Sequence, residues 1–253
     1  MALQQKGMHG TWASRWTFIM AATGSAVGLG NMWKFPYVAG SNGGGAFVLV
    51  YLGCILLIGV PVMMAEVLIG RQGRQSPINA MRDAVHESGA DSRWRHVGWV
   101  GVAAGMLILS FYAVIAGWAL AYIFEAASGE LTGINGDTAG NIFAALLADP
   151  SRLIFWQSIF MLLCVGVVVG GVKKGLGVAV EILMPLLFIM LLLLLGFSYL
   201  HGDFAAAWNF LFNFNLELLT WRGVLEAMGQ AFFTLSIGMG AIMAYGAYMP
   251  QKA

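Results

Sequence analysis

Charged side chains are scarce in this sequence. Aspartate, glutamate, lysine and arginine make up 10% of the 253 residues, and 59% of the residues are hydrophobic, whereas about a quarter of an ordinary soluble domain is charged. The net charge of +1 leaves no basic stripe or charged face, which argues against a nucleic-acid partner. No nucleophile–base pair, metal-ligand cluster or phosphate-binding loop stands out, so nothing in the sequence indicates an enzyme.

Cysteine is also rare, and the sequence lacks a recognisable signal-peptide cleavage site. Cys54 and Cys164 each lie inside an apolar run, where a thiol usually behaves as a small buried hydrophobe. The first apolar run begins near Trp16, contains glycines, Asn31 and Lys34, and is longer than the hydrophobic region of a signal peptide. We therefore expect this run to be retained as a membrane span.

Apolar runs, by contrast, are abundant. A helix needs about 20 apolar residues to cross the hydrocarbon of a bilayer. Such runs occupy residues 16–40, 46–70, 97–128, 153–172, 178–200 and 224–249. The sequence therefore predicts an all-α integral membrane protein with six transmembrane helices.

The distribution of cations predicts the orientation. Arginines are concentrated between the second and third runs, and Lys173 and Lys174 lie between the fourth and fifth, so both connections should be cytoplasmic. The opposite loops are acidic or poor in cations. With Lys6 and Arg15 before the first run, we expect a multi-pass protein of the plasma (inner) membrane with its N-terminus in the cytoplasm.

Glycines interrupt the first run. Gly24, Gly28 and Gly30 lie within seven residues, and each weakens a helix by roughly 1 kcal/mol relative to alanine. Either the helix breaks there, which at membrane depth indicates a site, or the small residues allow close helix packing. The sixth run favours a break, because residues 236–240 repeat the pattern of residues 26–30, and paired glycine-interrupted segments mark the binding sites of transporters.

These motifs resemble the neurotransmitter:sodium symporter family. The matching residues are Trp12, 28–31, 34–36, 42–47, Pro61, Glu66, 70–71, Tyr112, Trp118 and 229–236. Several long motifs in the same order over almost the whole chain are far more specific than one glycine pattern.

The resemblance implies a fold of ten core helices in two inverted repeats of five. This chain would supply the first repeat and the first helix of the second, with helices one and six unwound at mid-membrane. The expected segments are a cytoplasmic N-terminus (1–15), the first five-helix repeat (16–200), an extracellular loop (201–223), and the sixth helix with a truncated C-terminal end (224–253). We therefore expect a fragment, a split gene product or a truncated copy.

The resemblance also implies sodium ligands. One site of the family would use the carbonyl of Ala26, the side-chain amide of Asn31, and the carbonyl and hydroxyl of Thr234; oxygen ligands suit a hard cation. The alternative for Asn31 is a helix cap. The other site would use the carbonyls of Gly24 and Val27 with further ligands from a later helix.

A substrate site is implied in the same way. Backbone N–H groups near Leu29 and Gly30, with the Tyr112 hydroxyl, would hold a carboxylate. Gly28 stands where amine transporters of the family have an aspartate, which favours amino acids over amines. The remaining matching positions are Ala26, Ile108, Phe233, Ser236 and Met239. On spacing alone, a stripe of Met and aromatic residues is more often core, so the pocket rests on the resemblance.

Two further groups match the family. Its chloride-site cluster corresponds to Tyr51, Gln230 and Thr234. The residue that decides chloride dependence lies on a later helix, so Cl⁻ stays undecided. Lys34 stands where the outer gate usually has an arginine, and Phe35 with Tyr112 resembles the aromatic part of that gate.

Other residues carry weaker expectations. His9 stands where an arginine of the inner gate is expected. Gly175 and Pro185 match a spacing that the family associates with unwinding of the fifth helix, for which a plain kink is the alternative. Glu66 and Glu181 lie within or at the edge of apolar runs, where carboxylates are functional candidates; Glu66 matches the family, and Glu181 has no assigned role.

The expected function is sodium-coupled symport of a neutral, apolar amino acid across the plasma membrane, as part of a full transporter. The expected partners are the amino acid, Na⁺, the lipid bilayer and a chain that supplies the missing helices. The alternative is a non-transporting, truncated partner that modulates a complete transporter. Sodium-stimulated uptake by this chain alone would exclude that alternative.

Overall fold

The computed structural model describes residues 11–28 and 30–249, and in these ranges the regular structure is helical. The α-helices of the first part are α1 (Arg15–Ala26), α2 (Phe35–Ser41), α3 (Gly45–Cys54), α4 (Val60–Gly73), α5 (Pro77–Ser88) and α6 (His96–Ser128). Those of the second part are α7 (Gly136–Ala148), α8 (Pro150–Val169), α9 (Gly177–His201), α10 (Phe204–Phe212), α11 (Trp221–Thr234) and α12 (Ala241–Ala247). Three short π-helical segments, Gly30–Lys34, Ile55–Gly59 and Val172–Leu176, and a 3-10 turn, Ser92–Arg95, precede or join them.

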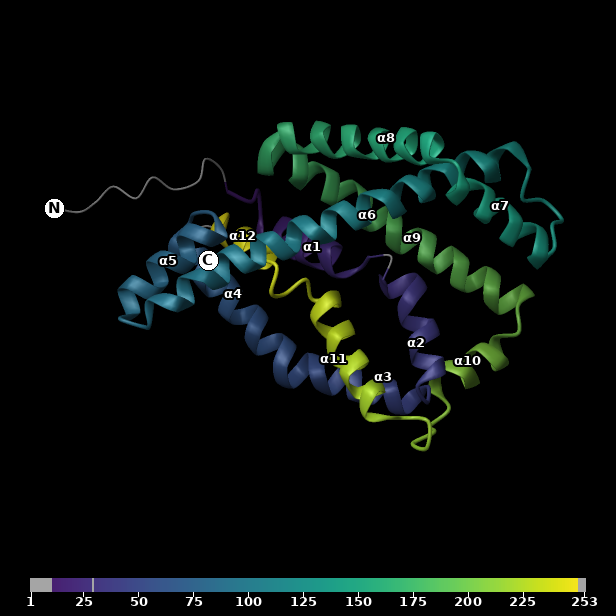
Figure 1. Cartoon of the computed structure of the whole chain (residues 1–253), viewed down its shortest axis with the longest axis horizontal. Coiled ribbons are helices and arrows are strands. Elements are labelled where there is room, and N and C mark those ends of the chain that lie inside the picture. Colours follow the sequence, from purple (N-terminus) through teal and green to yellow (C-terminus); the bar gives the residue numbers. More distant parts are fainter. Residues whose placement is uncertain (1–10, 29, 250–253) are drawn as a thin grey trace.

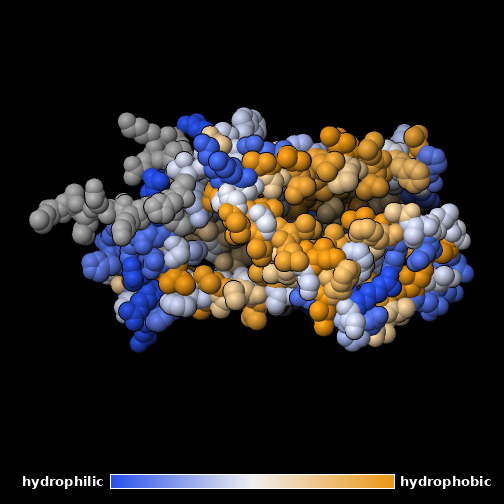
Figure 2. All heavy atoms as spheres, turned by 90° about the horizontal axis from the view of Figure 1, so that it is seen from above, coloured by the Kyte–Doolittle hydropathy of each residue, from blue (hydrophilic) through white to orange (hydrophobic). Residues whose placement is uncertain are grey.

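Four helical stretches are long and apolar enough to cross a membrane. They are Gly45–Gly73, Ser92–Ser128, Pro150–Val169 and Val172–His201, and they cover the second to fifth predicted runs. Helix α8 buries none of its residues within the described chain, as expected of an apolar helix that faces lipid or further helices. The face shown in Figure 2 is hydrophobic over its middle and hydrophilic toward both ends.

The first and sixth predicted runs are each divided. Helix α1 ends at Ala26, where Val27 has extended backbone angles, and the chain becomes helical again at Gly30. Helix α11 ends at Thr234, and α12 begins only at Ala241. No single helix of spanning length covers either run within residues 11–28 and 30–249, so the count of six spans and the depth of the breaks stay predictions.

Three helices lie in regions expected to be loops. Each of α5, α7 and α10 begins at a local signal: Pro77 opens α5, and the side chains of Asn135 and Asp203 accept hydrogen bonds from the N–H groups of Thr138 and Ala206. Proline at the first turn and Asn or Asp before it favour helix starts. All three helices are shorter than the roughly 20 residues that a span needs, so a search for apolar runs of that length does not find them.

Helices distant in sequence pack closely where glycines permit it. Helix α12 packs on α4, α6 on α8, and α1 on α9, and Figure 1 shows α6 running across the molecule between α8 and the α4–α5 hairpin. A Cβ atom at Gly70 would lie 1.9 Å from the Met243 carbonyl oxygen, and one at Gly246 would lie 2.6 Å from that of Val67. Only glycine therefore permits this approach of α4 and α12.

Candidate functional site

The ends of the two divided helices lie together. The Ser236 hydroxyl donates a 2.8 Å hydrogen bond to the carbonyl of Ser25, in the last turn of α1. Ser236 has a φ of 53°, which residues other than glycine rarely adopt, and backbone strain of this kind is concentrated at functional sites. The segment after α1 and the segment between α11 and α12 therefore form the candidate site.

Three of the expected sodium ligands meet at Asn31. The side-chain nitrogen of Asn31 donates to the Ala26 carbonyl at 2.5 Å. Its side-chain oxygen accepts a 2.8 Å bond from the Thr234 hydroxyl and a 3.3 Å bond from Gln230. The structure thus brings Ala26, Asn31 and Thr234, from two interrupted segments, to one point.

The backbone carbonyl of Thr234 accepts no helical hydrogen bond within the described chain, because its usual donor bonds to the carboxylate of Glu66 instead. In a continuous helix it would accept from the N–H four residues later, which belongs to Gly238. That N–H instead donates to Glu66 Oε1 at 2.6 Å, and no backbone N–H in the described ranges bonds to the Thr234 carbonyl. Glu66, on α4 and 8% exposed, therefore keeps this oxygen available for another ligand.

The expected chloride-site residues surround the same point. The Tyr51 hydroxyl donates a 3.1 Å bond to the Thr234 hydroxyl oxygen. The Gln230 amide donates to the Gly30 carbonyl at 3.4 Å and to Asn31. The three side chains lie together, while chloride binding by them stays a prediction.

An aromatic wall stands beside Gly30. The rings of Tyr112 and Phe233 lie 5.7 Å apart between centroids. A Cβ atom at Gly30 would lie 2.5 Å from Phe233 Cε1 and 3.5 Å from the Tyr112 oxygen, so the rings can approach only because residue 30 is glycine. A Cβ at Gly28 would meet no heavy atom within 4 Å, which leaves open space there.

One face of α6 lines the other side. Gly105, Ile108 and Tyr112 recur at helical spacing and share this face. A Cβ at Gly105 would lie 3.4 Å from the Met239 carbonyl oxygen, so α6 passes beneath the segment between α11 and α12. Ile108 is half-buried. Whether its side chain and that of Met239 contact a substrate stays a prediction.

The other expected residues are placed as follows. Gly24 packs against α9, since a Cβ there would lie 2.8 Å from Met184 Sδ, and Val27 follows α1 directly. Lys34 is exposed. Leu29 and His9 lie outside the described residues.

The aromatic rings at the expected outer gate pair differently from the sequence interpretation. Phe35 packs on Tyr51 and Phe47, with centroids 4.7 and 6.1 Å away. Tyr112 has Phe233 as its partner across the site. The ring that lies with Tyr112 is thus Phe233, and a gate role of Lys34 and Phe35 stays a prediction.

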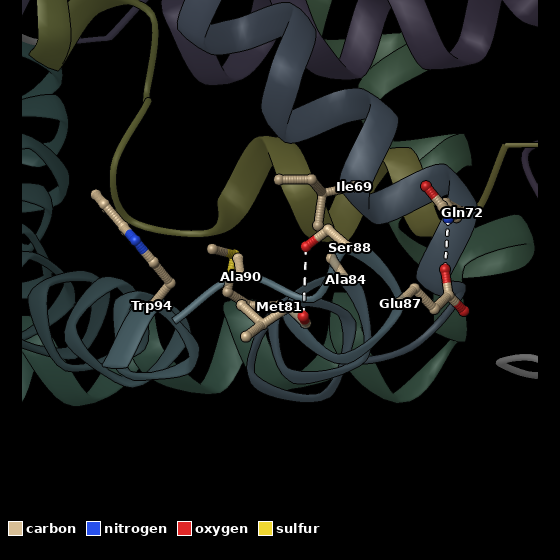
Figure 3. A pocket seen from close by; sticks show the side chains of 9 residues that line it. Ile69, Gln72, Met81, Ala84, Glu87, Ser88, Ala90 and Trp94 are labelled. Atoms are coloured by element: carbon tan, nitrogen blue, oxygen red, sulfur yellow. Dashed lines mark hydrogen bonds between the residues drawn. The ribbon is translucent and has the colours of Figure 1, made fainter. Parts of the chain in front are cut away.

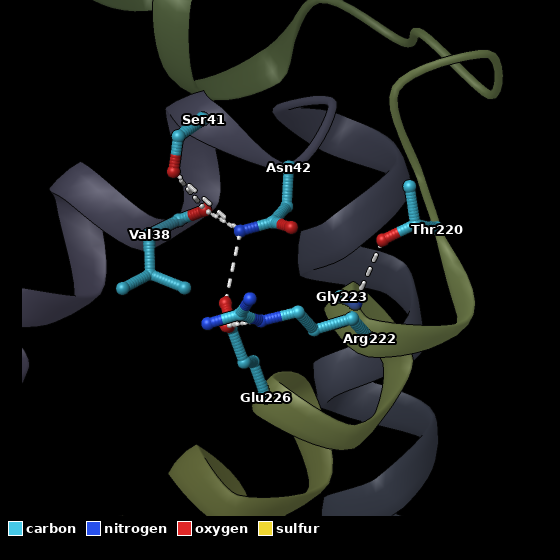
Figure 4. Close-up of polar contacts among 7 residues, drawn as sticks. All are labelled: Val38, Ser41, Asn42, Thr220, Arg222, Gly223 and Glu226. Carbon is cyan, nitrogen blue, oxygen red and sulfur yellow. Dashed lines mark hydrogen bonds and ion pairs between the residues drawn. The ribbon is translucent and has the colours of Figure 1, made fainter.

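The end of α2 and the start of α11 are joined by a polar cluster (Figure 4). The Asn42 amide nitrogen donates to Glu226 Oε2 at 3.2 Å and to the Val38 carbonyl at 2.9 Å. The other oxygen of Glu226 accepts from Arg222 at 3.1 Å. These bonds link the start of α11 to the end of α2, so the two segments that follow and precede the candidate site are tied together.

An open surface pocket lies away from these residues. It has a volume of about 510 Å³ and lies between α4, α5 and the turn before α6, lined by Ile69, Met81, Val85 and Trp94 together with polar Gln72 and Glu87, which are hydrogen-bonded to each other (Figure 3). None of the expected site residues lines it. The candidate site is identified by its converging polar atoms, several of which bond to each other.

Two polar contacts were not anticipated from the sequence. Glu125, 5% exposed, pairs with Arg152 at 2.8 Å and joins α6 to α8. Thr17, 1% exposed, donates to Glu181 and joins α1 to α9. A carboxylate in an apolar run is a signal for such a partner, but the sequence does not show which residue it meets.

The chain is similar to known transporters. A model of the sodium:neurotransmitter symporter family matches residues 9–142. The chain is 42% identical over 240 residues to the uncharacterized sodium-dependent transporter YhdH of Bacillus subtilis (strain 168), covering 95% of this chain and 52% of the relative. It is 26% identical over 271 residues to the sodium-dependent neutral amino acid transporter B(0)AT2 of Rattus norvegicus, covering 94% of this chain and 36% of the relative.

A solved structure shows the same fold. The crystal structure of MhsT in complex with L-phenylalanine matches with a TM-score of 0.86 and 44% sequence identity, over 97% of this chain and 55% of that chain. The chain spans about half the length of the curated relatives it matches.

Proposed function

The chain belongs to the sodium:neurotransmitter symporter family, and from this premise we propose that it forms part of a sodium-coupled symporter for a neutral, apolar amino acid. It would contribute the first five-helix repeat and the first helix of the second, in the segments 1–15, 16–200, 201–223 and 224–253. The observation that carries the proposal is the meeting of Ala26, Asn31 and Thr234. Transport is proposed for the full transporter, since the relatives are about twice as long.

Sodium would replace hydrogen bonds that now join its ligands. A turn of the Asn31 amide would point its oxygen toward the Ala26 carbonyl, and the Thr234 hydroxyl and free carbonyl adjoin the same point. Helices α1 and α11 both end here, and the C-terminal end of a helix carries partial negative charge that favours a cation. Carbonyl and amide oxygens at broken helices are the ligands that transporters use for Na⁺.

The substrate carboxylate would bind next to the cation. The space beside Gly28 is open, and residue 28 brings no carboxylate of its own, so an amino acid could supply one. The π-helical segment begins at Gly30. Since the N–H groups of Asn31 and Met32 already bond to the Gly28 carbonyl, the N–H of Gly30 is the donor that we propose there for the carboxylate. A carboxylate shared between Na⁺ and this donor would couple the binding of the two.

The lining favours an apolar side chain. Phe233, Ile108 and Met239 are the side chains expected around it, and the aromatic wall is present beside Gly30. The structure of MhsT contains L-phenylalanine, and B(0)AT2 is named a neutral amino acid transporter. Both agree with a neutral substrate for this chain.

The proposed setting is the plasma membrane, with the N-terminus in the cytoplasm. Thr17, early in α1, lies next to Glu181, early in α9, and Gly24, later in α1, lies next to Met184. The two helices therefore run in the same direction, as the first and fifth spans of an alternating series do. Lys173 and Lys174, which precede α9, then lie on the same side as Arg15.

Uptake into proteoliposomes tests the proposal. The protein from the complete native gene is reconstituted, and accumulation of radiolabelled L-phenylalanine is measured with an inward sodium gradient and with potassium in its place. We expect accumulation only with sodium, and competition by other apolar amino acids rather than by glutamate or dopamine. Equal accumulation in potassium would refute sodium coupling. Replacing chloride by gluconate in a further arm decides chloride dependence.

A further inference from the structure

Helix α1 connects the candidate sodium site to the N-terminal part of the chain. It has 12 residues, and at its end the extended backbone of Val27 interrupts the helical hydrogen bonding. Its last turn carries the Ala26 carbonyl of the candidate site. A helix of 12 residues is marginal on its own, so without helical continuation at its far end its other contacts determine whether it stays packed and folded.

Helix α1 packs on α9, but within the described ranges few hydrogen bonds hold it besides those of its last turn to Asn31 and Ser236. Before the helix, Trp12 donates from its ring nitrogen to the Tyr245 carbonyl at 2.9 Å and from its backbone to the Tyr248 carbonyl at 3.1 Å. Within the helix, the Thr17 hydroxyl donates to Glu181 Oε1 at 2.5 Å. This is the one side-chain hydrogen bond between α1 and α9 in the part of the chain that the structure describes.

The Thr17 side of this contact is enclosed by the packing. Thr17 is 1% exposed, and Gly177 of α9 lies beside it, since a Cβ there would be in contact with the Thr17 methyl carbon at 3.4 Å. Ser14, which caps α1, also lies 3.0 Å from the Thr17 hydroxyl. Glu181 itself is exposed within the described chain, in the first turns of an apolar helix, where a carboxylate is costly unless it has a partner or reaches water.

We propose that Glu181 is a positioning residue that holds α1 against α9 through Thr17, and that breaking this bond is a step in opening the candidate site toward the cytoplasm. The proposal rests on the proposed function, because it assumes that substrate and Na⁺ leave along the side that α1 covers. In the proposed orientation, Thr17 and Glu181 lie on the cytoplasmic side of Ala26. A hydrogen bond to a carboxylate is strong enough that its loss changes a local equilibrium by about ten-fold or more.

Hydrogen–deuterium exchange measures this opening without reference to transport. The full transporter from the native gene is compared with Thr17→Val, which removes the donor, Glu181→Leu, which removes the acceptor, and the double variant. We expect amide exchange in residues 15–26 to rise by about ten-fold in each single variant, and to rise no further in the double variant, while exchange in α6 is unchanged. Two residues that act through one bond give this non-additive pattern.

Conservative variants separate a specific bond from general packing. Thr17→Ser and Glu181→Gln retain a donor and an acceptor oxygen, so both should exchange at close to the native rate. Thr23→Val makes the same substitution six residues further along α1, at a hydroxyl with no hydrogen bond to α9 in the described chain, and should also leave the exchange rate unchanged. Native exchange rates in both Thr17→Val and Glu181→Leu, or additive increases in the double variant, would overturn the proposal.

Transport by the same proteins distinguishes the two proposals. L-Phenylalanine is supplied outside the proteoliposomes with an inward sodium gradient. Thr17→Val and Glu181→Leu should then raise the KM for uptake several-fold relative to the native protein, because the arrangement with the site closed toward the cytoplasm is less populated. Sodium-independent uptake by the native protein would refute the proposed function and leave the exchange result valid. Altered exchange in the variants with an unchanged KM would refute the assignment of this contact to the transport cycle.

Discussion

Replacing Gly30 by alanine should weaken substrate binding through a steric clash with the aromatic wall. The added Cβ would lie 2.5 Å from Phe233 Cε1 and 3.5 Å from the Tyr112 oxygen, whereas carbon atoms in contact lie about 3.5–4.0 Å apart. The Phe233 ring must therefore move by about 1 Å, and with it the ring packing on Tyr112. Overpacking of this kind costs about 1–3 kcal/mol, which corresponds to a loss of affinity of about 5- to 150-fold.

The assay is equilibrium binding of radiolabelled L-phenylalanine to the purified full transporter in saturating sodium. Gly229→Ala is the matched control, because the same methyl group on α11 would meet no heavy atom within 4 Å; its affinity should equal that of the native protein. A correctly folded Gly30→Ala protein with native affinity would show that the approach of Phe233 to Gly30 does not shape the site. An equal loss in the Gly229→Ala control would point to a general effect of glycine replacement instead.

Three other predictions follow from the same structure. Gly28→Asp should weaken amino-acid binding, because its carboxylate would compete with that of the substrate for the cation; native affinity in a scintillation proximity assay would show that Gly28 does not face the substrate carboxylate. Arg152→Leu should lower the free energy of unfolding by about 2–3 kcal/mol, because it leaves the buried Glu125 unpaired. Arg222→Leu, at an exposed i,i+4 pair, should lower it by under about 0.5 kcal/mol, so equal melting temperatures of the two variants would contradict this difference. Residues 1–253 expressed alone should insert with both ends in the cytoplasm yet catalyse no sodium-dependent uptake, because alternating access needs both repeats; robust uptake by them would show that they assemble a site in another way.

Much of the candidate site could be anticipated from local sequence. The glycines at 24–30 and 238–240 lower helix stability, and α1 and α11 end beside these segments. The resemblance points to Asn31 and Thr234, and the structure joins their side chains at 2.8 Å. These residues lie within the motifs themselves, so their placement depends mainly on where two helices break.

Contacts between distant helices could not be anticipated in the same way. Glu181 was recognised as an unusual carboxylate, but its partner Thr17 is 164 residues away, and helix hydropathy gives no information about which faces meet. The bond from Gly238 to Glu66 is similar, since it depends on how α4 packs against the segment after α11. The pairing of Tyr112 with Phe233 rather than Phe35 follows from the position of Gly30, which only the packed structure reveals.

The central claim is that Na⁺ binds between Asn31, Thr234 and the end of α1, and direct binding of radioactive sodium tests it. Binding to the purified full transporter is measured in the native protein, in Thr234→Val, which keeps the side-chain shape and removes the hydroxyl ligand, and in Thr132→Val at an exposed loop as the control. We predict saturable sodium binding in the native protein and the control, with an affinity lower by about ten-fold or more in Thr234→Val. Native sodium affinity in a folded Thr234→Val protein would contradict the claim.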